Sequence, residues 1–115
     1  MSAKILQINY KLNGPRAEYE RENLTYAQPI ADILGLRWKV WIINEAENEA
    51  GGIYLFDDDA AVQAFLDGPI IAEMKGDPTL SIKAFDVIAE LTTITRGPVK
   101  EYSRSLGGTV RRPPG

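Results

Sequence analysis

The stretch from Leu36 to Phe56 limits what this chain can fold into more than any other part of the sequence. β-Branched and aromatic residues dominate its first half and alternate with a period of two, which is typical of a strand with buried faces. After the polar, acidic segment 44–49 the alternation resumes from Ile53 to Phe56, so the stretch predicts a β-hairpin. The first strand divides its residues between two faces: Leu36, Trp38, Val40 and Ile42 on one, and Arg37, Lys39, Trp41 and Ile43 on the other.

Two adjacent glycines, Gly51 and Gly52, stand where the second strand of this hairpin begins. Such a pair is compatible with a β-bulge, or with a place where a ligand or another stretch of backbone comes close. The simplest interpretation, which we favour, is a loop exit whose dihedral angles other residues avoid.

The segment before the hairpin begins with a strand and a turn. Residues Lys4 to Leu12 alternate with the period of a strand, and Gln7 and Asn9 are polar members of one face. Asn13-Gly14-Pro15 is turn chemistry, because Asn and Gly tolerate positive φ and Pro suits the first turn of a following helix. A short amide among apolar neighbours needs a hydrogen-bond partner, so Asn9 is the best polar candidate for a ligand contact.

Residues Arg16 to Leu34 predict the first helix, which Gly35 ends in a left-handed conformation. Pro29 lies inside this helix and removes one hydrogen bond. We therefore expect a kink at Pro29, and the alternative is a new helix that begins near Thr25. The apolar stripe expected to face the sheet consists of Leu24, Ala27, Ala31 and Leu34, reinforced by Ile30 and Ile33.

Three aspartates, Asp57, Asp58 and Asp59, follow the hairpin. Adjacent carboxylates suggest a metal site, but the favoured interpretation is that one of them caps the next helix and the others meet its dipole. The remaining pattern predicts helical segments at Ala60 to Leu66 and Ile70 to Lys75, and a last strand at Ser81 to Ile88.

The order of these elements, βαββαβ, predicts an α+β, ferredoxin-like fold with a four-stranded antiparallel sheet and helices on one face. Both faces of the predicted strands carry large apolar residues, whereas two helices can cover only one face. Because large apolar patches are rarely left in water, we expect a homodimer in which two sheets stack.

Composition excludes several classes of function. The 115-residue chain contains neither histidine nor cysteine, which excludes Ser–His triads, thiolate nucleophiles, disulfides and metal sites built from those residues. It has no glycine-rich nucleotide-binding motif, no apolar run of membrane-spanning length and no pattern of a signal peptide. We therefore expect a single cytoplasmic domain without metal and without membrane contact.

Charge is distributed unevenly along the chain. Residues 1–95 carry eight Lys/Arg and fifteen Asp/Glu, or −7, whereas residues 96–115 carry five and one, or +4. The acidic body argues against nucleic acid as a partner. We expect residues 1–95 to form the domain and residues 96–115 a basic tail, either flexible in solvent or an arm that orders on a dimer partner.

Four motifs occur in one order and spacing: N-G-P at 13–15, W-K-V-W at 38–41, E-A-G-G-I-Y-L-F at 49–56 and K-A-F-D-V at 83–87. Together they resemble the YdhR-type monooxygenase family over roughly residues 4–98. The resemblance implies a ferredoxin-like domain that pairs into a dimeric α+β barrel. It also implies a relation to small monooxygenases that work without a cofactor.

In such enzymes, the resemblance implies, dioxygen takes an electron from a deprotonated phenol or hydroquinone. The protein excludes water, holds the aromatic ring and stabilises the developing charge. Strand residues that could line a cavity between sheet and helices are candidates for the site: Trp38, Asn9 and Tyr54 as catalytic donors, and Trp41, Phe56, Lys83 and Phe85 as substrate-binding residues.

Each of these residues has a structural alternative in the core, at a dimer interface or on a solvated strand edge. A second class of function also stays open. A non-catalytic dimeric barrel that binds a small apolar molecule would need the same aromatic cavity.

Overall fold

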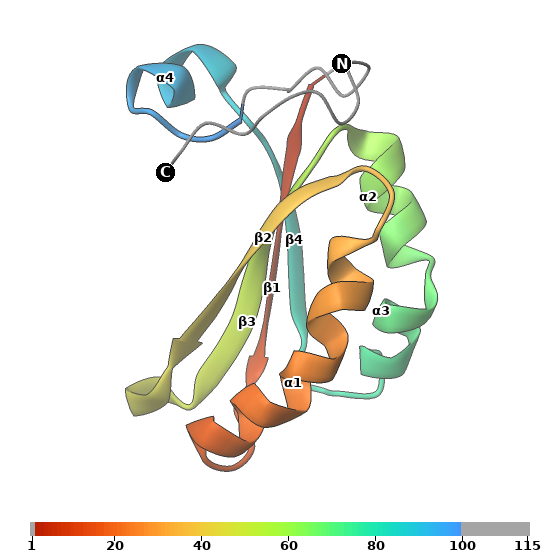
Figure 1. Cartoon of the computed structure of the whole chain (residues 1–115), viewed down its shortest axis with the longest axis vertical. Helices are drawn as coiled ribbons and strands as arrows, with labels where there is room; N and C mark the ends of the chain where they lie inside the picture. The colour runs from red at the N-terminus through yellow and green to blue at the C-terminus, as the bar shows by residue number, and fades with distance from the viewer. Residues whose placement is uncertain (1, 100–115) are drawn as a thin grey trace.

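A four-stranded antiparallel sheet organises the chain, and the computed structural model describes residues 2–99 of it (Figure 1). The strand order is β2-β3-β1-β4, which is the ferredoxin-like arrangement and confirms the predicted fold. Along the chain the elements are β1 Lys4–Lys11, α1 Arg16–Ala31, β2 Leu36–Asn44, the 3₁₀ turn η1 Glu45–Glu47, β3 Glu49–Phe56, α2 Asp59–Leu66, α3 Pro69–Met74, β4 Ser81–Asp86 and α4 Ala89–Ile94.

Helices α1, α2 and α3 lie on one side of the sheet, and α4 lies at one end on the other side (Figure 1). Strand pairing assigns the strand residues to two surfaces. The helix-covered face is formed by Leu6, Ile8, Tyr10, Leu36, Lys39, Trp41, Gly52, Tyr54, Phe56 and Ile82. The open face is formed by Ile5, Gln7, Asn9, Trp38, Val40, Ile42, Ile53, Leu55, Lys83 and Phe85.

The hydrophobic core fills the space between the helix-covered face and the helices. Phe56 is fully buried at its centre, and the rings of Tyr54 and Phe65 pack beside it with centroids 6.0 and 5.5 Å from its own. Burial of side chains of this size contributes about 1.5–3 kcal/mol each. The core therefore fixes the sheet side of the space in which any cavity under the helices must lie.

A β-bulge near the start of β2 corrects the predicted alternation. Leu36 pairs with Phe56 and Trp38 pairs with Leu55, so the extra residue Arg37 shifts the register between them. Leu36 and Trp38 therefore lie on opposite faces, and the prediction that they share one was wrong. After the bulge, Lys39 shares the helix-covered face with the buried Leu36.

The glycine pair in β3 is explained by close approach, and the favoured interpretation as a loop exit with unusual dihedrals was wrong. Among the described glycines, positive φ is found at Gly14 and Gly35, not at this pair. A Cβ at Gly51 would collide with the backbone oxygen of Ile8 on the neighbouring strand. A Cβ at Gly52 would collide with Cε of Lys39.

Helix α1 runs through Pro29 without interruption, so the alternative of a new helix at Thr25 is not observed. The helix ends at Ala31 rather than Leu34, and its C-cap is Asp32. Gly35, with φ of 86°, lies beyond the helix and turns the chain into β2. Its missing side chain leaves room for Ala61, whose Cβ would lie 2.6 Å from an added Cβ.

The predicted apolar stripe of α1 was confirmed at Ile30 and Ile33, which lie in or against the core. It was wrong at Leu24 and Leu34, which are 73% and 92% exposed. The residues of α1 that line the interior recur at spacings of four, three and four: Tyr19, Asn23, Tyr26 and Ile30. Polar and aromatic residues take the inner face here because they border a cavity rather than a closed core.

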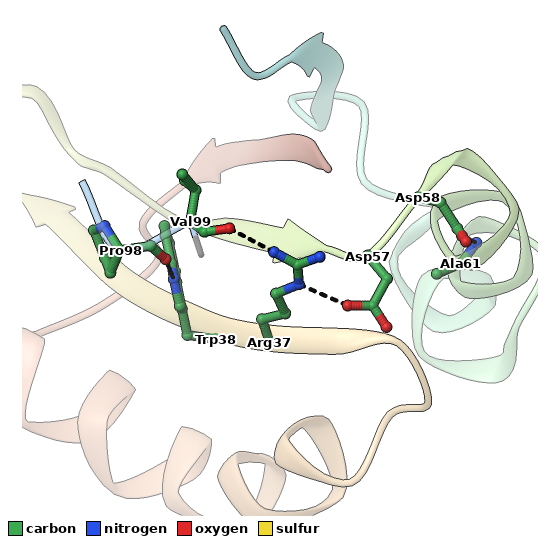
Figure 2. A network of polar contacts seen from close by, with 7 residues as sticks. All are labelled: Arg37, Trp38, Asp57, Asp58, Ala61, Pro98 and Val99. Atoms are coloured by element: carbon green, nitrogen blue, oxygen red, sulfur yellow. Dashed lines mark hydrogen bonds and ion pairs between the residues drawn. The ribbon is translucent and has the colours of Figure 1, made fainter. Parts of the chain in front are cut away.

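The predicted helix cap was confirmed and assigned to one aspartate. The carboxylate of Asp58 accepts a hydrogen bond of 2.9 Å from the backbone N–H of Ala61, at the start of α2. Its neighbour Asp57 instead accepts from Nε of Arg37 at 2.6 Å (Figure 2). Within residues 2–99, no three acidic side chains are arranged to hold a metal ion.

The chain after β4 returns to the start of β2. The indole N–H of Trp38 donates to the carbonyl oxygen of Pro98 at 2.8 Å, and Nη1 of Arg37 donates to that of Val99 at 2.6 Å (Figure 2). The last strand ends at Asp86 rather than Ile88. Residues 100–115, most of the predicted basic tail, lie outside the described residues. No helix in the described part of the chain is both long and apolar enough to cross a membrane.

Candidate functional site

A cavity of about 370 Å³ lies between the helix-covered face and helices α1 and α3. We call it the helix-side cavity. Its volume falls within the range of small-molecule sites, near the lower end. Aromatic side chains from three strands and one helix form much of its wall, together with the ε-amine of one lysine. The lining consists of Tyr10, Lys11, Asn13, Tyr19, Glu22, Asn23, Tyr26, Ile30, Lys39, Trp41, Tyr54, Ile70, Glu73, Met74 and Asp77.

Lys39 lies across the aromatic wall of this cavity. Its Nζ is 3.3 Å from the centre of the Trp41 ring and 4.6 Å from that of Tyr54. Trp41 and Lys39 are two residues apart on β2 and so point the same way, and Tyr54 is the partner of Lys39 on β3. Gly52 lies opposite Trp41, and its lack of a side chain leaves the room that the lysine stem occupies.

The amine of Lys39 is balanced between its charged and neutral forms near neutral pH. Burial lowers its pKa from 10.5 to about 7. Within residues 2–99 no carboxylate forms an ion pair with it, whereas Lys4, Arg16 and Arg37 each pair with one. The ring faces attract the charged form, which opposes the effect of burial. Such an amine can accept a proton from a bound molecule and then hold the resulting negative charge.

Tyr54 contributes a hydroxyl that no other described residue engages. The residue is only 3% exposed, yet its Oη makes no hydrogen bond within residues 2–99. Burial raises its pKa, so the hydroxyl keeps its proton at neutral pH. Every fully enclosed side-chain polar atom in the described residues has a partner, so this hydroxyl keeps an opening toward the cavity that its residue lines. It is therefore available to a bound molecule.

Two further hydroxyls of the cavity lining meet each other. Oη of Tyr10 on β1 and Oη of Tyr19 on α1 are 2.5 Å apart. Burial raises the pKa of both groups, so both remain protonated at neutral pH. Because one hydroxyl accepts from the other, the accepting residue retains a hydrogen that it can donate elsewhere.

The sheet separates the sequence-predicted site residues into two groups. Tyr54 and Trp41 line the helix-side cavity together, and Phe56 is fully buried in the core beside Tyr54. Trp38, Asn9, Lys83 and Phe85 lie on the open face, so the prediction that all seven line one cavity was wrong.

One predicted donor already has a partner within the chain, because the indole N–H of Trp38 donates to Pro98. Asn9 is engaged through its acceptor, since its Oδ1 accepts from Nε2 of Gln7 at 2.9 Å. Among the predicted donors, Tyr54 alone lines the cavity with an uncommitted hydroxyl.

Sequence reasoning missed Lys39, Tyr10 and Tyr19. The signal for Lys39 was present, because a lysine alternates with Trp41 in a segment, 38–43, whose other residues are apolar, and a glycine pair follows on the next strand. Tyr19 was missed because the apolar stripe of α1 was assigned to the wrong side of the helix. Its pairing with Tyr10 depends on the packing of α1 against β1, which no local pattern reveals.

Comparison with known proteins agrees with the resemblance seen in the sequence. The family model described as "Putative mono-oxygenase ydhR" matches residues 5–98, which is most of the chain. The chain belongs to the ydhR family. Nothing among functionally curated proteins matches it in sequence.

Solved structures of three proteins share the fold of this ydhR-family member, at identities that carry no more than the fold. A Nitrosomonas europaea protein of unknown function, NE2512, matches with a TM-score of 0.60 and 19% identity, over 76% of this chain and 91% of its own. A point mutant of SnoaB, a cofactor-independent oxygenase from Streptomyces nogalater, matches with a TM-score of 0.60 and 16% identity, over 76% of this chain and 95% of its own. The heme-degrading protein Rv3592 from Mycobacterium tuberculosis matches with a TM-score of 0.55 and 21% identity, over 76% of this chain and 94% of its own.

Proposed function

We propose that this ydhR-family protein is a cofactor-independent monooxygenase that oxidises a small phenol or hydroquinone in the helix-side cavity. The observation that carries the proposal is the ε-amine of Lys39, which lies on the rings of Trp41 and Tyr54 inside a cavity of about 370 Å³. Membership of a family of mono-oxygenases and a shared fold with a cofactor-independent oxygenase support the same reaction class.

The first chemical task is removal of the phenol proton. The neutral amine of Lys39 accepts this proton, and the ammonium that results stays beside the phenolate. The aromatic wall holds the substrate ring, and the hydroxyl of Tyr54 donates a hydrogen bond to the developing oxyanion. The site thus has a base in a protein that contains no histidine.

The second task is transfer of electrons to dioxygen, for which the substrate is the only reductant. The phenolate gives one electron to dioxygen, and the two radicals combine into a peroxide on a ring carbon that carries a hydrogen ortho or para to the hydroxyl; in a hydroquinone this is an ortho carbon. Loss of water from this peroxide leaves a quinone. One phenol or hydroquinone and one dioxygen thus yield one quinone and one water, and the substrate supplies all four electrons.

The open face is the natural place for a second copy of the chain. Val40 and Phe85 are 50% and 47% exposed on it, and Leu91 and Ile94 of α4 are exposed at one end of the same side (Figure 1). Monomeric proteins rarely leave so many large apolar residues in water on one side of a sheet. We include in the proposal a homodimer that stacks two open faces, with each helix-side cavity on the outside of the pair.

The test is oxygen uptake by the purified full-length protein against anthrols and naphthohydroquinones, corrected for spontaneous oxidation. Lys39→Met is expected to lower the rate by about 10²–10⁴-fold, the usual contribution of a general base. The matched control is Lys75→Met, because Lys75 is exposed and does not line the cavity. Absence of uptake across the panel contradicts the proposal, and tight binding without uptake supports a small-molecule-binding barrel instead.

A further inference from the structure

The ε-amine of Lys39 is placed as lysines on strand surfaces rarely are. A long cationic side chain normally extends to solvent or pairs with a carboxylate. Here the stem crosses the space above Gly52, and the amine ends on two aromatic rings inside a cavity. The protein therefore holds a primary amine, free of an acidic partner in the described part of the chain, where a small aromatic molecule fits.

A primary amine in such a setting is a nucleophile toward carbonyl groups. Desolvation in an apolar pocket is a general way in which proteins activate lysine for imine formation. Burial lowers the pKa of Lys39 to about 7, so about half of the amine is neutral at pH 7, whereas an ordinary lysine is neutral to less than about 0.1%.

We propose that Lys39 is a carbonyl-reactive residue, and that the helix-side cavity captures aromatic aldehydes as imines on its Nζ. This activity is separate from oxygenation, because it consumes no dioxygen and depends only on the cavity and the amine. It therefore stands or falls independently of the proposed monooxygenase reaction.

The reaction balances without an oxidant or reductant. Nζ of Lys39 forms a bond to the carbonyl carbon, and the carbonyl oxygen takes up a proton to give a carbinolamine. The amine then loses its remaining proton and the hydroxyl leaves as water, so that one aldehyde and one lysine yield one imine and one water. Tyr54, whose hydroxyl keeps its proton, is the nearest phenol ring to the amine and can assist the departure of water.

The cavity wall indicates the class of aldehyde. Its volume of about 370 Å³ suits one or two fused rings, and the faces of Trp41 and Tyr54 offer stacking on either side of the amine. The Tyr10–Tyr19 pair retains one donor hydrogen in the cavity lining. A ring that carries a hydroxyl or another acceptor away from its aldehyde uses this donor, so hydroxyaryl aldehydes are the favoured ligands.

The test is reductive trapping followed by peptide mapping. The full-length protein is incubated at pH 7 without oxygen with 4-hydroxybenzaldehyde and cyanoborohydride, and labelling of each lysine is followed by mass spectrometry. Lys39 is expected to be labelled at least about tenfold faster than the exposed Lys75 and Lys83. Slower labelling of Lys39 than of these two lysines overturns the proposal.

Two variants and one competitor separate a built site from general reactivity. Gly52→Ala keeps the amine but places a methyl group where Cε of Lys39 lies, so labelling of Lys39 is expected to fall at least about fivefold while the exposed lysines are unchanged. Lys75→Arg removes an exposed amine and is expected to leave labelling of Lys39 unaltered.

An excess of 4-hydroxybenzyl alcohol, which has the same ring but no carbonyl, is expected to protect Lys39 by occupying the cavity. Propanal, which has no ring, is expected to lose the preference for Lys39. Equal preference for propanal, or no protection by the alcohol, contradicts the role assigned to the aromatic wall. Labelling of Lys39 without oxygen uptake on the phenol panel would refute the monooxygenase and leave this proposal standing.

Discussion

The two faces of the sheet are built from the same four strands, yet they present opposite chemistry. On the helix-covered face, a lysine, a tryptophan and a tyrosine line a cavity, and the amine of the lysine lies over both rings. On the open face, Val40 and Phe85 are about half exposed, and the indole N–H of Trp38 and Oδ1 of Asn9 are already hydrogen-bonded within the chain.

The comparison shows how position relative to the helices decides what a residue can do. Trp38 and Trp41 are three residues apart and both carry an indole. Trp41 offers its ring face to a cation in a cavity, whereas Trp38 commits its N–H to the chain segment that follows α4. We therefore assign chemistry to the covered face and association to the open face.

The sharpest contrast is between the two neighbouring glycines of β3. In Gly51→Ala the added Cβ meets the backbone of Ile8, which no side-chain rotation relieves, so β1 and β3 must separate. We expect a loss of about 4 kcal/mol or more in the free energy of unfolding, measured by urea denaturation. In the matched variant Gly52→Ala the overlap is with the flexible stem of Lys39, and the ring of Tyr54 is at contact distance, so we expect it to cost about 1–2 kcal/mol. Equal losses would show that Lys39 is not free to move.

The association assigned to the open face is tested by charge. Val40→Asp places a carboxylate on the open face, within the proposed dimer interface, and the desolvation cost is expected to raise the dimer dissociation constant at least about 100-fold, or about 3 kcal/mol. Analytical ultracentrifugation measures this directly. Leu24→Asp is the control, because Leu24 is 73% exposed on α1, on the other side of the sheet. A wild-type protein that stays monomeric at high concentration would contradict the proposed dimer.

The covered face predicts a dependence of stability on pH. The folded-state pKa of Lys39 is about 7 and its ordinary value is 10.5, so between these values the unfolded chain binds more protons. Stability from this group is therefore lowest below pH 7 and rises between pH 7 and about 10. Partial exposure to solvent reduces the effect, and we expect about 2–3 kcal/mol.

Other groups that face Lys39 set the upper limit of this rise. The raised pKa values of Tyr10, Tyr19 and Tyr54 mean that their ionisation favours the unfolded chain, so stability falls again above about pH 10. Glu22, Glu73 and Asp77 also line the cavity, and hydrogen bonds from Thr79 lower the pKa of Asp77, away from this window. Urea denaturation from pH 6 to 10 is expected to show the rise in wild type and to lose it in Lys39→Met. A rise that persists in this variant would assign it to another group.

The smallest effect is expected at Trp38. Trp38→Phe keeps an aromatic ring but removes the hydrogen bond to Pro98, so the expected cost is about 1 kcal/mol in the free energy of unfolding. A fluorescence-monitored urea titration, with Trp41 as the remaining reporter, detects it. A loss above about 3 kcal/mol would mean that this edge contact holds more of the fold than one hydrogen bond.

Much of the fold was predictable because the hairpin, the turn at Asn13-Gly14-Pro15 and the cap at Asp58 are local signals. The site was less predictable because it depends on which face of the sheet each residue of β2 takes and on how α1 packs against the sheet. The bulge at Arg37 changes which residues share a face with Leu36, and only strand pairing reveals it. The inner side of α1 carries Tyr19, Asn23 and Tyr26, which read as surface residues until the cavity beneath them is known.

Side chains of β2 alternate between the two faces of the sheet, and the bulge at Arg37 interrupts this alternation once, near the start of the strand. Before the bulge, Leu36 points toward the helices. After it, Lys39 and Trp41 point the same way as Leu36, although Lys39 follows Leu36 by an odd number of residues. Insertion or deletion of one residue between Lys39 and Asn44 would move every side chain on one side of the change to the opposite face of the sheet. Insertion or deletion of two residues would leave each side chain on its present face. Relatives that keep the amine over the aromatic rings should therefore vary in the length of this strand by even steps.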